Sequence, residues 1–340
     1  MPASRRLLLL PALGAASVLA LAGCASASAA PAASDDATIT VVTSTNVYGQ
    51  IAQEIAGDAV EVVPIISSGA QDPHGYEATA ADQLTVQNAD LIIENGGGYD
   101  SFMDSLIEGS GSEAPVIVAA EYSHSWPGTE ADEHTTDELE ETPHAEEEHA
   151  DDVHADDHDH DHDHVEGFNE HVWYDPHTIE HVAEAIADEL STLVPAEADT
   201  FAANADAFIT QIGGLEASLA EIDAAHAGAQ VFVTEPVPGY LIAAAGLANA
   251  TPDEFSEAVE EGQDVPPATL LEALDAVRSG DVKVVIANAQ TGGAETTQVI
   301  DAATAAGLPV LEFTETLPEG QTYIQWMQQN IEELAGALGA

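Results

Sequence analysis

Short apolar runs alternate with stretches of helical apolar spacing along most of the chain after residue 37. The short runs are rich in Val and Ile, which favours strands, whereas apolar residues repeated every three or four positions favour helices. In the first half, strands are expected at 37–44, 60–66, 90–98 and 115–120, and helices at 46–57, 79–89, 99–107 and, from Pro176, 176–190. Strands that alternate with helices form mainly parallel sheets covered on both faces.

The second half repeats this alternation after one long helical run at 196–228. Strands are expected at 229–235, 282–290 and 308–315, and helices at 238–247, 266–280, 294–307 and 320–338. We therefore predict an α/β fold of two lobes with mainly parallel sheets, joined by one long backbone helix. The predicted boundaries are 38–190 for the N-terminal lobe, 191–227 for the linking helix and 228–340 for the C-terminal lobe. A cleft between two lobes is the usual place for a ligand.

Between 121 and 166 this pattern gives way to Glu, Asp, His and Thr with hardly any apolar residues. Such a stretch cannot bury a core, so we expect a disordered loop inserted into the N-terminal lobe. The rest of the chain, with 45% hydrophobic residues overall, is long enough for two lobes of ordinary size.

The first residues have the layout of an export signal. Arg5 and Arg6 precede an apolar run, which is followed by small residues. The run ends in "LAGC" before a tether rich in Ser, Ala and Pro, which resembles the lipobox of bacterial lipoproteins. We therefore expect a signal peptide at 1–23, lipidation of Cys24 and a flexible tether at 24–37. Cys24 is the only cysteine, so an intramolecular disulfide or a cysteine-based metal site is excluded.

The net charge of −58 limits the possible partners. After Cys24 the only basic residues are Arg278 and Lys283, so nucleic acid and bare anionic lipid would be repelled. Attachment to a membrane therefore needs the lipid anchor. Such acidity raises the local concentration of cations. It is at least as well explained by a general adaptation of surface proteins to salt or by a lineage of acidic proteins.

Histidines and glutamates follow several of the expected strands. His74 follows the strand 60–66, and His171 lies near the end of the first lobe. Glu235 and Glu315 come at the ends of the first and last strands of the second lobe. Parallel sheets bind ligands beyond the carboxyl ends of their strands, so these four side chains can converge across the cleft. Two imidazoles and two carboxylates suit a divalent transition metal ion.

The polar insertion carries a second kind of metal-binding pattern. Nine histidines lie between His124 and His164, and the last four alternate with aspartate: His158, His160, His162 and His164. We expect this tract to hold metal loosely, as an accessory to the site in the cleft.

Other polar residues near these positions have supporting roles in our interpretation. Asp72, Glu170 and Asp175 either orient a metal-binding histidine or open a turn. His177 and His181 are four apart on a helix, a spacing that can bind metal, but without a nearby third ligand we interpret them as surface residues. We expect Asn288 and Gln290, at the end of a strand, to line the cleft without touching metal.

Five motifs in order resemble one family. "DPHGYE", "HVWYDP", "TEPVPGYLIAAAGL", the His-rich insertion and the lipobox are similar to those of the zinc/manganese substrate-binding lipoproteins of bacterial ABC transporters. The resemblance implies two Rossmann-like lobes joined by a rigid helix and a metal ion between them. It places the ligands at His74, His171, Glu235 and a final acidic residue, for which Glu315 is preferred to Glu312.

The resemblance leaves the metal open. Glu235 stands in "TEPVPGY" where zinc members usually have a histidine, which is closer to the manganese and iron members, whereas the His-rich insertion is typical of zinc members. We favour Zn²⁺, with Mn²⁺ next, because Zn²⁺ outcompetes Mn²⁺ at nearly any nitrogen and oxygen site. The predicted role is an extracytoplasmic, lipid-anchored, monomeric protein that delivers metal to an ABC permease and is not an enzyme. A metal-dependent hydrolase and an adhesin with a structural metal are the alternatives.

Overall fold

The computed structural model describes residues 38–127, 165 and 167–339. Its first sheet consists of β1 (Thr40–Thr45), β2 (Glu61–Ile66), β3 (Leu91–Glu94) and β4 (Val116–Val118), in the order β2-β1-β3-β4. All neighbouring strands in it are parallel. Adjacent residues of a strand point to opposite faces, so Val41 and Val42 both become buried, on opposite sides of β1.

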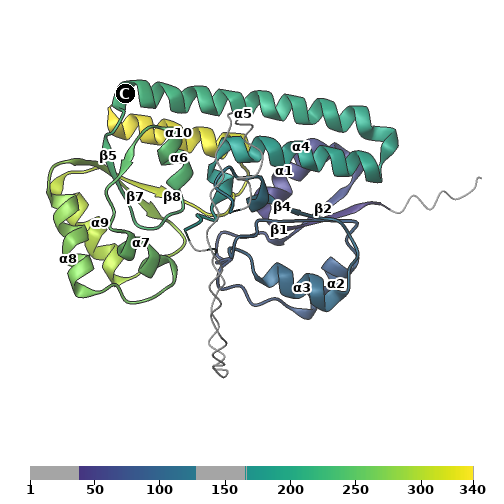
Figure 1. Ribbon diagram of the computed structural model, residues 1–340, viewed down its shortest axis with the longest axis horizontal. Helices are drawn as coiled ribbons and strands as arrows, with labels where there is room; N and C mark the ends of the chain where they lie inside the picture. Colours follow the sequence, from purple (N-terminus) through teal and green to yellow (C-terminus); the bar gives the residue numbers. More distant parts are fainter. Residues whose placement is uncertain (1–37, 128–164, 166, 340) are drawn as a thin grey trace, which may run out of the picture. The chain divides into compact units, whose positions relative to one another are not determined.

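Helices cover both faces of this sheet (Figure 1). On the Val41 face lie α1 (Asn46–Ala56) and α4 (Pro176–Leu193), and on the Val42 face lie α2 (Ala80–Gln87) and α3 (Phe102–Ser110). Short 3-10 turns occur at Gly57–Ala59, Ala119–Tyr122 and Val172–Tyr174.

The second sheet is also parallel and has the order β6-β5-β7-β8. Its strands are β5 (Gln230–Val233), β6 (Ala248–Asn249), β7 (Val282–Asn288) and β8 (Val310–Phe313). Phe232 and Val285 pack against α8 (Pro267–Arg278) and α9 (Ala294–Ala306) on one face. On the other face lie α5 (Ala198–His226), α6 (Gly239–Ala244) and α10 (Tyr323–Leu338). The prediction of an α/β fold with two parallel-stranded lobes is confirmed.

The long helix α5 has 29 residues, which corresponds to about 44 Å at ~1.5 Å per residue. Figure 1 shows it passing over both sheets. Phe201 and Ile222, near its two ends, belong to one continuous apolar core that includes residues of both sheets. A shared core of this kind resists independent movement of the lobes.

The linking helix begins later than the predicted residue 191. Residues 191–193 still belong to α4, the 3-10 turn Pro195–Glu197 follows, and α5 starts at Ala198. Pro195 lacks an N–H and restricts the residue before it, so α4 and α5 cannot be continuous.

Two further differences concern polar segments. The strand β6, which has two residues, and the helix α7 (Asp253–Glu260) were not predicted; α7 has only eight residues, and four of them are acidic. The predicted loop 121–166 begins too early: Ser123 is buried, and Trp126 lies with its ring centroid 5.1 Å from that of Phe168. The remainder of that loop, 128–164 and 166, lies outside the described residues.

Candidate metal centre

The carboxyl ends of the two sheets carry the polar side chains that the sequence singled out. His74 lies in the loop after β2, Glu235 and Glu315 each lie two residues beyond the ends of β5 and β8, and His171 precedes the turn Val172–Tyr174. Because all strands in each sheet are parallel, their carboxyl ends share one edge.

His171 is fully buried and its ring is held by a neighbour. The Oδ1 atom of Asn169 lies 2.8 Å from Nδ1 of His171 and also accepts the His171 backbone N–H at 3.1 Å. The Asn169 amide nitrogen donates to the carbonyl of Pro236 at 3.0 Å, which fixes the orientation of the amide. Nδ1 of His171 therefore carries the proton, and Nε2 presents its lone pair to the site.

His74 is positioned by the turn in which it lies. Its backbone N–H donates to Oδ1 of Asp72 at 3.0 Å, so Asp72 acts as a turn residue. The His74 side chain is only 12% exposed, and its ring packs edge-on against Tyr99 with centroids 4.9 Å apart. Its ring centroid lies 5.8 Å from that of His171.

Glu315 completes this group from the second lobe. Its Oε2 lies 3.8 Å from Nε2 of His74, and its side chain is 1% exposed. One atom from each of His74, His171 and Glu315 can be chosen so that all three lie within 4.8 Å of one another. Glu312, the alternative acidic residue, is exposed on β8, so its carboxylate does not share this buried position.

Glu235 is buried beside the group but is engaged elsewhere. Its carboxylate accepts hydrogen bonds from the hydroxyl of Thr291 at 2.6 Å and from Nδ2 of Asn288 at 2.8 Å. The same Asn288 amide donates to Oε1 of Glu315 at 2.5 Å. Asn288 thus holds the two carboxylates next to each other, and Glu235 does not belong to the converging trio.

Gln290 links the loop that bears His74 to the segment that bears Glu315. Its amide nitrogen donates to the carbonyl of Gly69, and its Oε1 accepts the backbone N–H groups of Glu315 and Thr316. These contacts fix the position of Glu315 relative to the loop that bears His74.

Two acidic residues beside the trio were not predicted as ligands. Oε1 of Glu260, the last residue of α7, lies 3.5 Å from Nε2 of His171. Glu170 and Glu260 also form a close group with His74. No pattern in the sequence pointed to Glu260, because it lies in an acidic helix that was not predicted and meets His171 only through tertiary packing.

Burial, and to a lesser extent neighbouring charges, raises the pKa values of the carboxyl groups in this centre. Burial, followed by the nearby charges of Glu235 and Asp72, raises the pKa of Glu315 to about 8. Burial, followed by Glu170, Glu235 and Glu315, also raises the pKa of Glu260. Oε2 of Glu315 and Oε1 of Glu260 have no hydrogen-bond partner within the described residues. Buried carboxylate oxygens of this kind, next to two imidazoles and without Lys or Arg, suit a divalent cation.

The other predicted residues lie elsewhere. Asp175 caps α4 by accepting from the N–H of His177 and the hydroxyl of Thr178. His177 and His181 lie on the exposed side of α4. Cys24 and His158, His160, His162 and His164 lie outside the described residues. No helix within the described ranges is long and apolar enough to cross a membrane.

Comparison with known proteins gives this arrangement a context. The model of a family described as the periplasmic component A of zinc-uptake complexes matches residues 41–337. The chain belongs to this family. This membership confirms the resemblance seen in the sequence. It also agrees with the prediction that the protein is a component of a transport system and not an enzyme.

Individual relatives differ in the metal for which they are named. The zinc-binding lipoprotein AdcA of Streptococcus pneumoniae serotype 4 is 26% identical over 308 residues, which cover 88% of this chain and 56% of AdcA. The manganese-binding lipoprotein MntA of Halalkalibacterium halodurans is 25% identical over 176 residues, which cover 52% of this chain and 47% of MntA. The chain thus spans about half the length of these curated relatives.

A solved structure shares the fold. The periplasmic zinc binding protein TroA from Treponema pallidum matches with a TM-score of 0.67 at 19% identity, covering 88% of this chain and 99% of that chain. At this identity the likeness concerns the fold alone.

Proposed function

We propose that this chain is the extracytoplasmic binding component of an ABC uptake system, which holds one divalent transition metal ion as cargo and passes it to a permease. The observation that carries the proposal is the convergence of His74, His171 and Glu315 from both lobes in a buried, acidic position. Membership in the zinc-uptake component family supports transport rather than catalysis.

The proposed ligands are Nε2 of His171, an imidazole nitrogen of His74, a carboxylate oxygen of Glu315 and a carboxylate oxygen of Glu235. Glu235 would have to turn from Thr291 toward the trio, and its bond to the shared Asn288 amide keeps it within reach of Glu315. Glu260 is the competing fourth ligand, because its Oε1 already lies 3.5 Å from His171.

We favour Zn²⁺ as the cargo, with Mn²⁺ next. Imidazole and carboxylate donors bind both ions, and affinity at such sites is higher for Zn²⁺ than for Mn²⁺. Relatives named for zinc and for manganese both match this chain, so the names of the relatives do not separate the two ions.

Attachment and metal gathering are proposed from the sequence. Lipidation of Cys24 would hold the protein at the outer face of the cell membrane, and AdcA and MntA are both named lipoproteins. The tract containing His158, His160, His162 and His164 would bind metal weakly and serve the buried site.

Metal analysis of untagged protein purified without chelator, followed by competition between Zn²⁺ and Mn²⁺, tests the cargo. His171→Ala should lower the affinity of the tight site at least about 100-fold, because it removes a donor from a buried group of carboxylates. His226→Ala, at the end of α5, is the matched control and should leave that affinity unchanged. Tight binding retained by His171→Ala would exclude the proposed site.

A further inference from the structure

A second group of potential metal ligands lies on the outer surface of two helices. His177 and Glu180 on α4 and Glu216 on α5 each offer one ligand atom, and these three atoms lie within 4.8 Å of one another. His177 and Glu216 are exposed and Glu180 is partly exposed. None of the three belongs to the buried centre around His171.

Helix packing brings the three side chains together. The helices α4 and α5 follow each other through the short turn Pro195–Glu197 and run side by side in opposite directions (Figure 1). On α4, residues three apart lie on the same face, so His177 and Glu180 are neighbours. On α5, Glu216 follows the buried Leu215 and lies at the solvent edge of the contact with α4.

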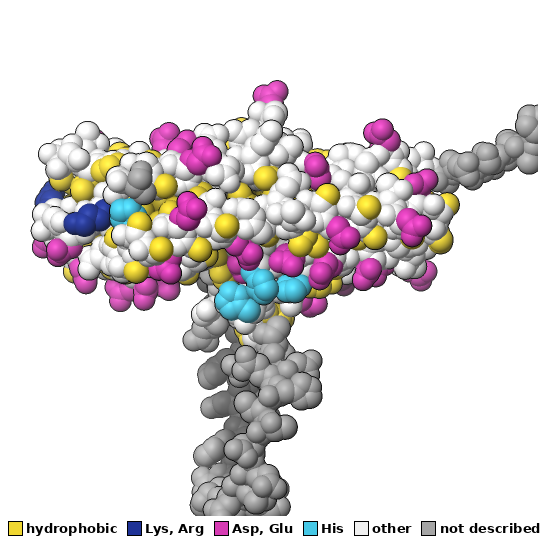
Figure 2. All heavy atoms as spheres, turned by 90° about the horizontal axis from the view of Figure 1, so that it is seen from above, with side chains coloured by type: hydrophobic (Ala, Val, Ile, Leu, Met, Phe, Trp, Pro, Cys, Tyr) yellow, Lys and Arg dark blue, Asp and Glu magenta, His cyan; other side chains and the backbone are white. Residues whose placement is uncertain are grey.

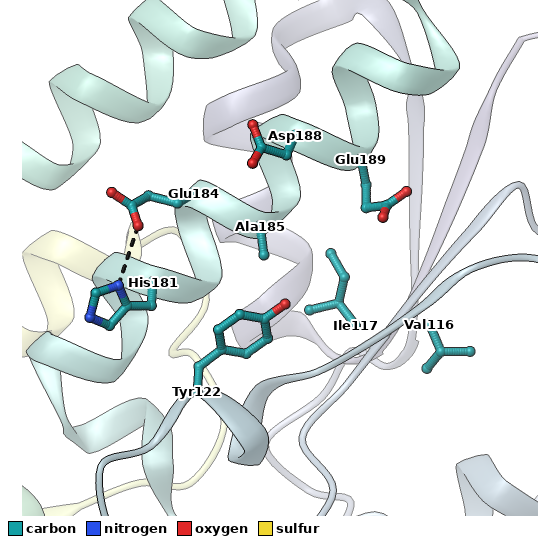
Figure 3. A pocket seen from close by; sticks show the side chains of 8 residues that line it. All are labelled: Val116, Ile117, Tyr122, His181, Glu184, Ala185, Asp188 and Glu189. Carbon is teal, nitrogen blue, oxygen red and sulfur yellow. Dashed lines mark hydrogen bonds and ion pairs between the residues drawn. The ribbon is translucent and has the colours of Figure 1, made fainter. Parts of the chain in front are cut away.

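A second imidazole stands beside this group. The ring of His181 lies 4.8 Å from that of His177, centroid to centroid. Figure 3 shows His181 turned toward Glu184, whose Oε2 lies 3.2 Å from its Nδ1. A carboxylate that accepts the Nδ1 proton leaves Nε2 as the nitrogen with a lone pair, which is the usual arrangement of a metal-binding histidine.

The surroundings lack positive side chains that could neutralise the carboxylates. No Lys or Arg occurs from Leu7 to Val277. On the face shown in Figure 2, acidic side chains are widely spread, histidines gather among them, and basic side chains are confined to one end. A divalent cation would remove the repulsion between Glu180 and Glu216 while using His177 as a nitrogen donor.

We propose that His177, Glu180 and Glu216 form a second, solvent-exposed site for a divalent transition metal ion, bridging α4 and α5, with His181 as an adjacent imidazole. One imidazole and two carboxylates, with water completing the coordination, suit Zn²⁺. The metal ion exchanges with the solvent faster, and binds with lower affinity, than at a buried centre, because the ligands are exposed and hydrated. The site stands on residues separate from those of the proposed function and does not depend on it.

The test follows the imidazole signals of His177 by NMR in the full chain, assigned by their loss in His177→Ala. Free Zn²⁺ is set by a metal buffer, so that other sites on the chain do not change its concentration. The signals should shift in a saturable way, and Glu216→Gln should raise the free Zn²⁺ at the midpoint at least about tenfold. Glu221→Gln removes an equal charge from an exposed position of the same helix and should leave the midpoint within about twofold.

Each outcome decides the proposal. A midpoint for Zn²⁺ that rises in Glu216→Gln but not in Glu221→Gln supports a metal site to which α5 contributes a ligand. Equal midpoints in Glu216→Gln and Glu221→Gln would show general attraction by the acidic surface and overturn the proposal. Signals of His177 that do not move up to about 1 mM free Zn²⁺ would overturn it as well, since that affinity corresponds to only ~4 kcal/mol of binding free energy. All substitutions lie at exposed or partly exposed helix positions, and thermal unfolding verifies that each variant is folded.

Discussion

Replacing Asn169 tests whether the buried centre depends on a fixed histidine tautomer. Asn169 accepts from Nδ1 of His171 at 2.8 Å and donates to the Pro236 carbonyl at 3.0 Å. In Asn169→Ala these two contacts are lost, together with the hydrogen bond that Oδ1 accepts from the His171 backbone N–H, so the ring of His171 can rotate and can place its proton on Nε2. A metal ion then has to select the competent tautomer and orientation, which costs affinity.

The expected loss follows from the two contacts that fix the ring: the hydrogen bond from Nδ1 of His171 and the one that holds the Asn169 amide on Pro236. One hydrogen bond contributes about 0.5–1.5 kcal/mol net, so two contribute about 1–3 kcal/mol. Partners of metal-binding histidines typically change affinity by about 10–100-fold, the same range. We therefore expect Asn169→Ala to weaken Zn²⁺ binding about 10–100-fold while the other ligands remain in place.

Asn169→Asp separates the two contacts. Its carboxylate still accepts the Nδ1 proton but cannot donate to Pro236, so retained affinity would assign the effect to the tautomer. The assay is competition with a chelator of known affinity at constant pH, which reports the tight site alone. An Asn169→Ala variant that binds Zn²⁺ as tightly as the wild type would refute the argument that Asn169 orients His171.

Three further predictions concern the fourth ligand, stability and movement. Glu235→Gln should lower Zn²⁺ affinity more than Glu260→Gln if Glu235 is the fourth ligand, and the opposite order in chelator competition would assign that position to Glu260. Burial, followed by Asp100, raises the pKa of Glu94 to about 8 from 4.5. The folded state therefore keeps a proton that the unfolded state loses above pH ~4.5, so stability falls as pH rises from ~4.5 to ~8, by about 3 kcal/mol at pH 7. Urea unfolding of the metal-free protein should show that Glu94→Gln makes the decline smaller by about 3 kcal/mol at pH 7, whereas Glu61→Gln, at an exposed strand position, leaves the decline unchanged. The decline that remains comes from Glu315 and Glu260, whose pKa values are also raised. Metal binding should slow hydrogen exchange in the loop 67–79 without changing exchange within α5, and a change along α5 would contradict the rigid helix.

The alternation of apolar patterns was sufficient to predict the two parallel sheets apart from β6, most of the helices that cover them and the strand ends at which His74 and Glu315 lie. This works because burial on both faces demands continuous apolar strands, and parallel pairing puts their carboxyl ends on one edge. The helix α7 is only eight residues long and half of them are acidic, and it was not predicted, so Glu260 at its end was missed. The ligand role of Glu235 remains a prediction.

Contacts between segments far apart in the chain were decided only by the tertiary structure. Asn169 holds His171 because its amide is fixed by Pro236 from the other lobe, and Glu216 joins His177 because α5 packs along α4. The pattern of the sequence determines which face of a strand or helix is buried, since that depends on local periodicity. It does not determine which polar side chains meet at the surface or edge of two packed elements, since that depends on their relative position and on the rotamers that packing permits.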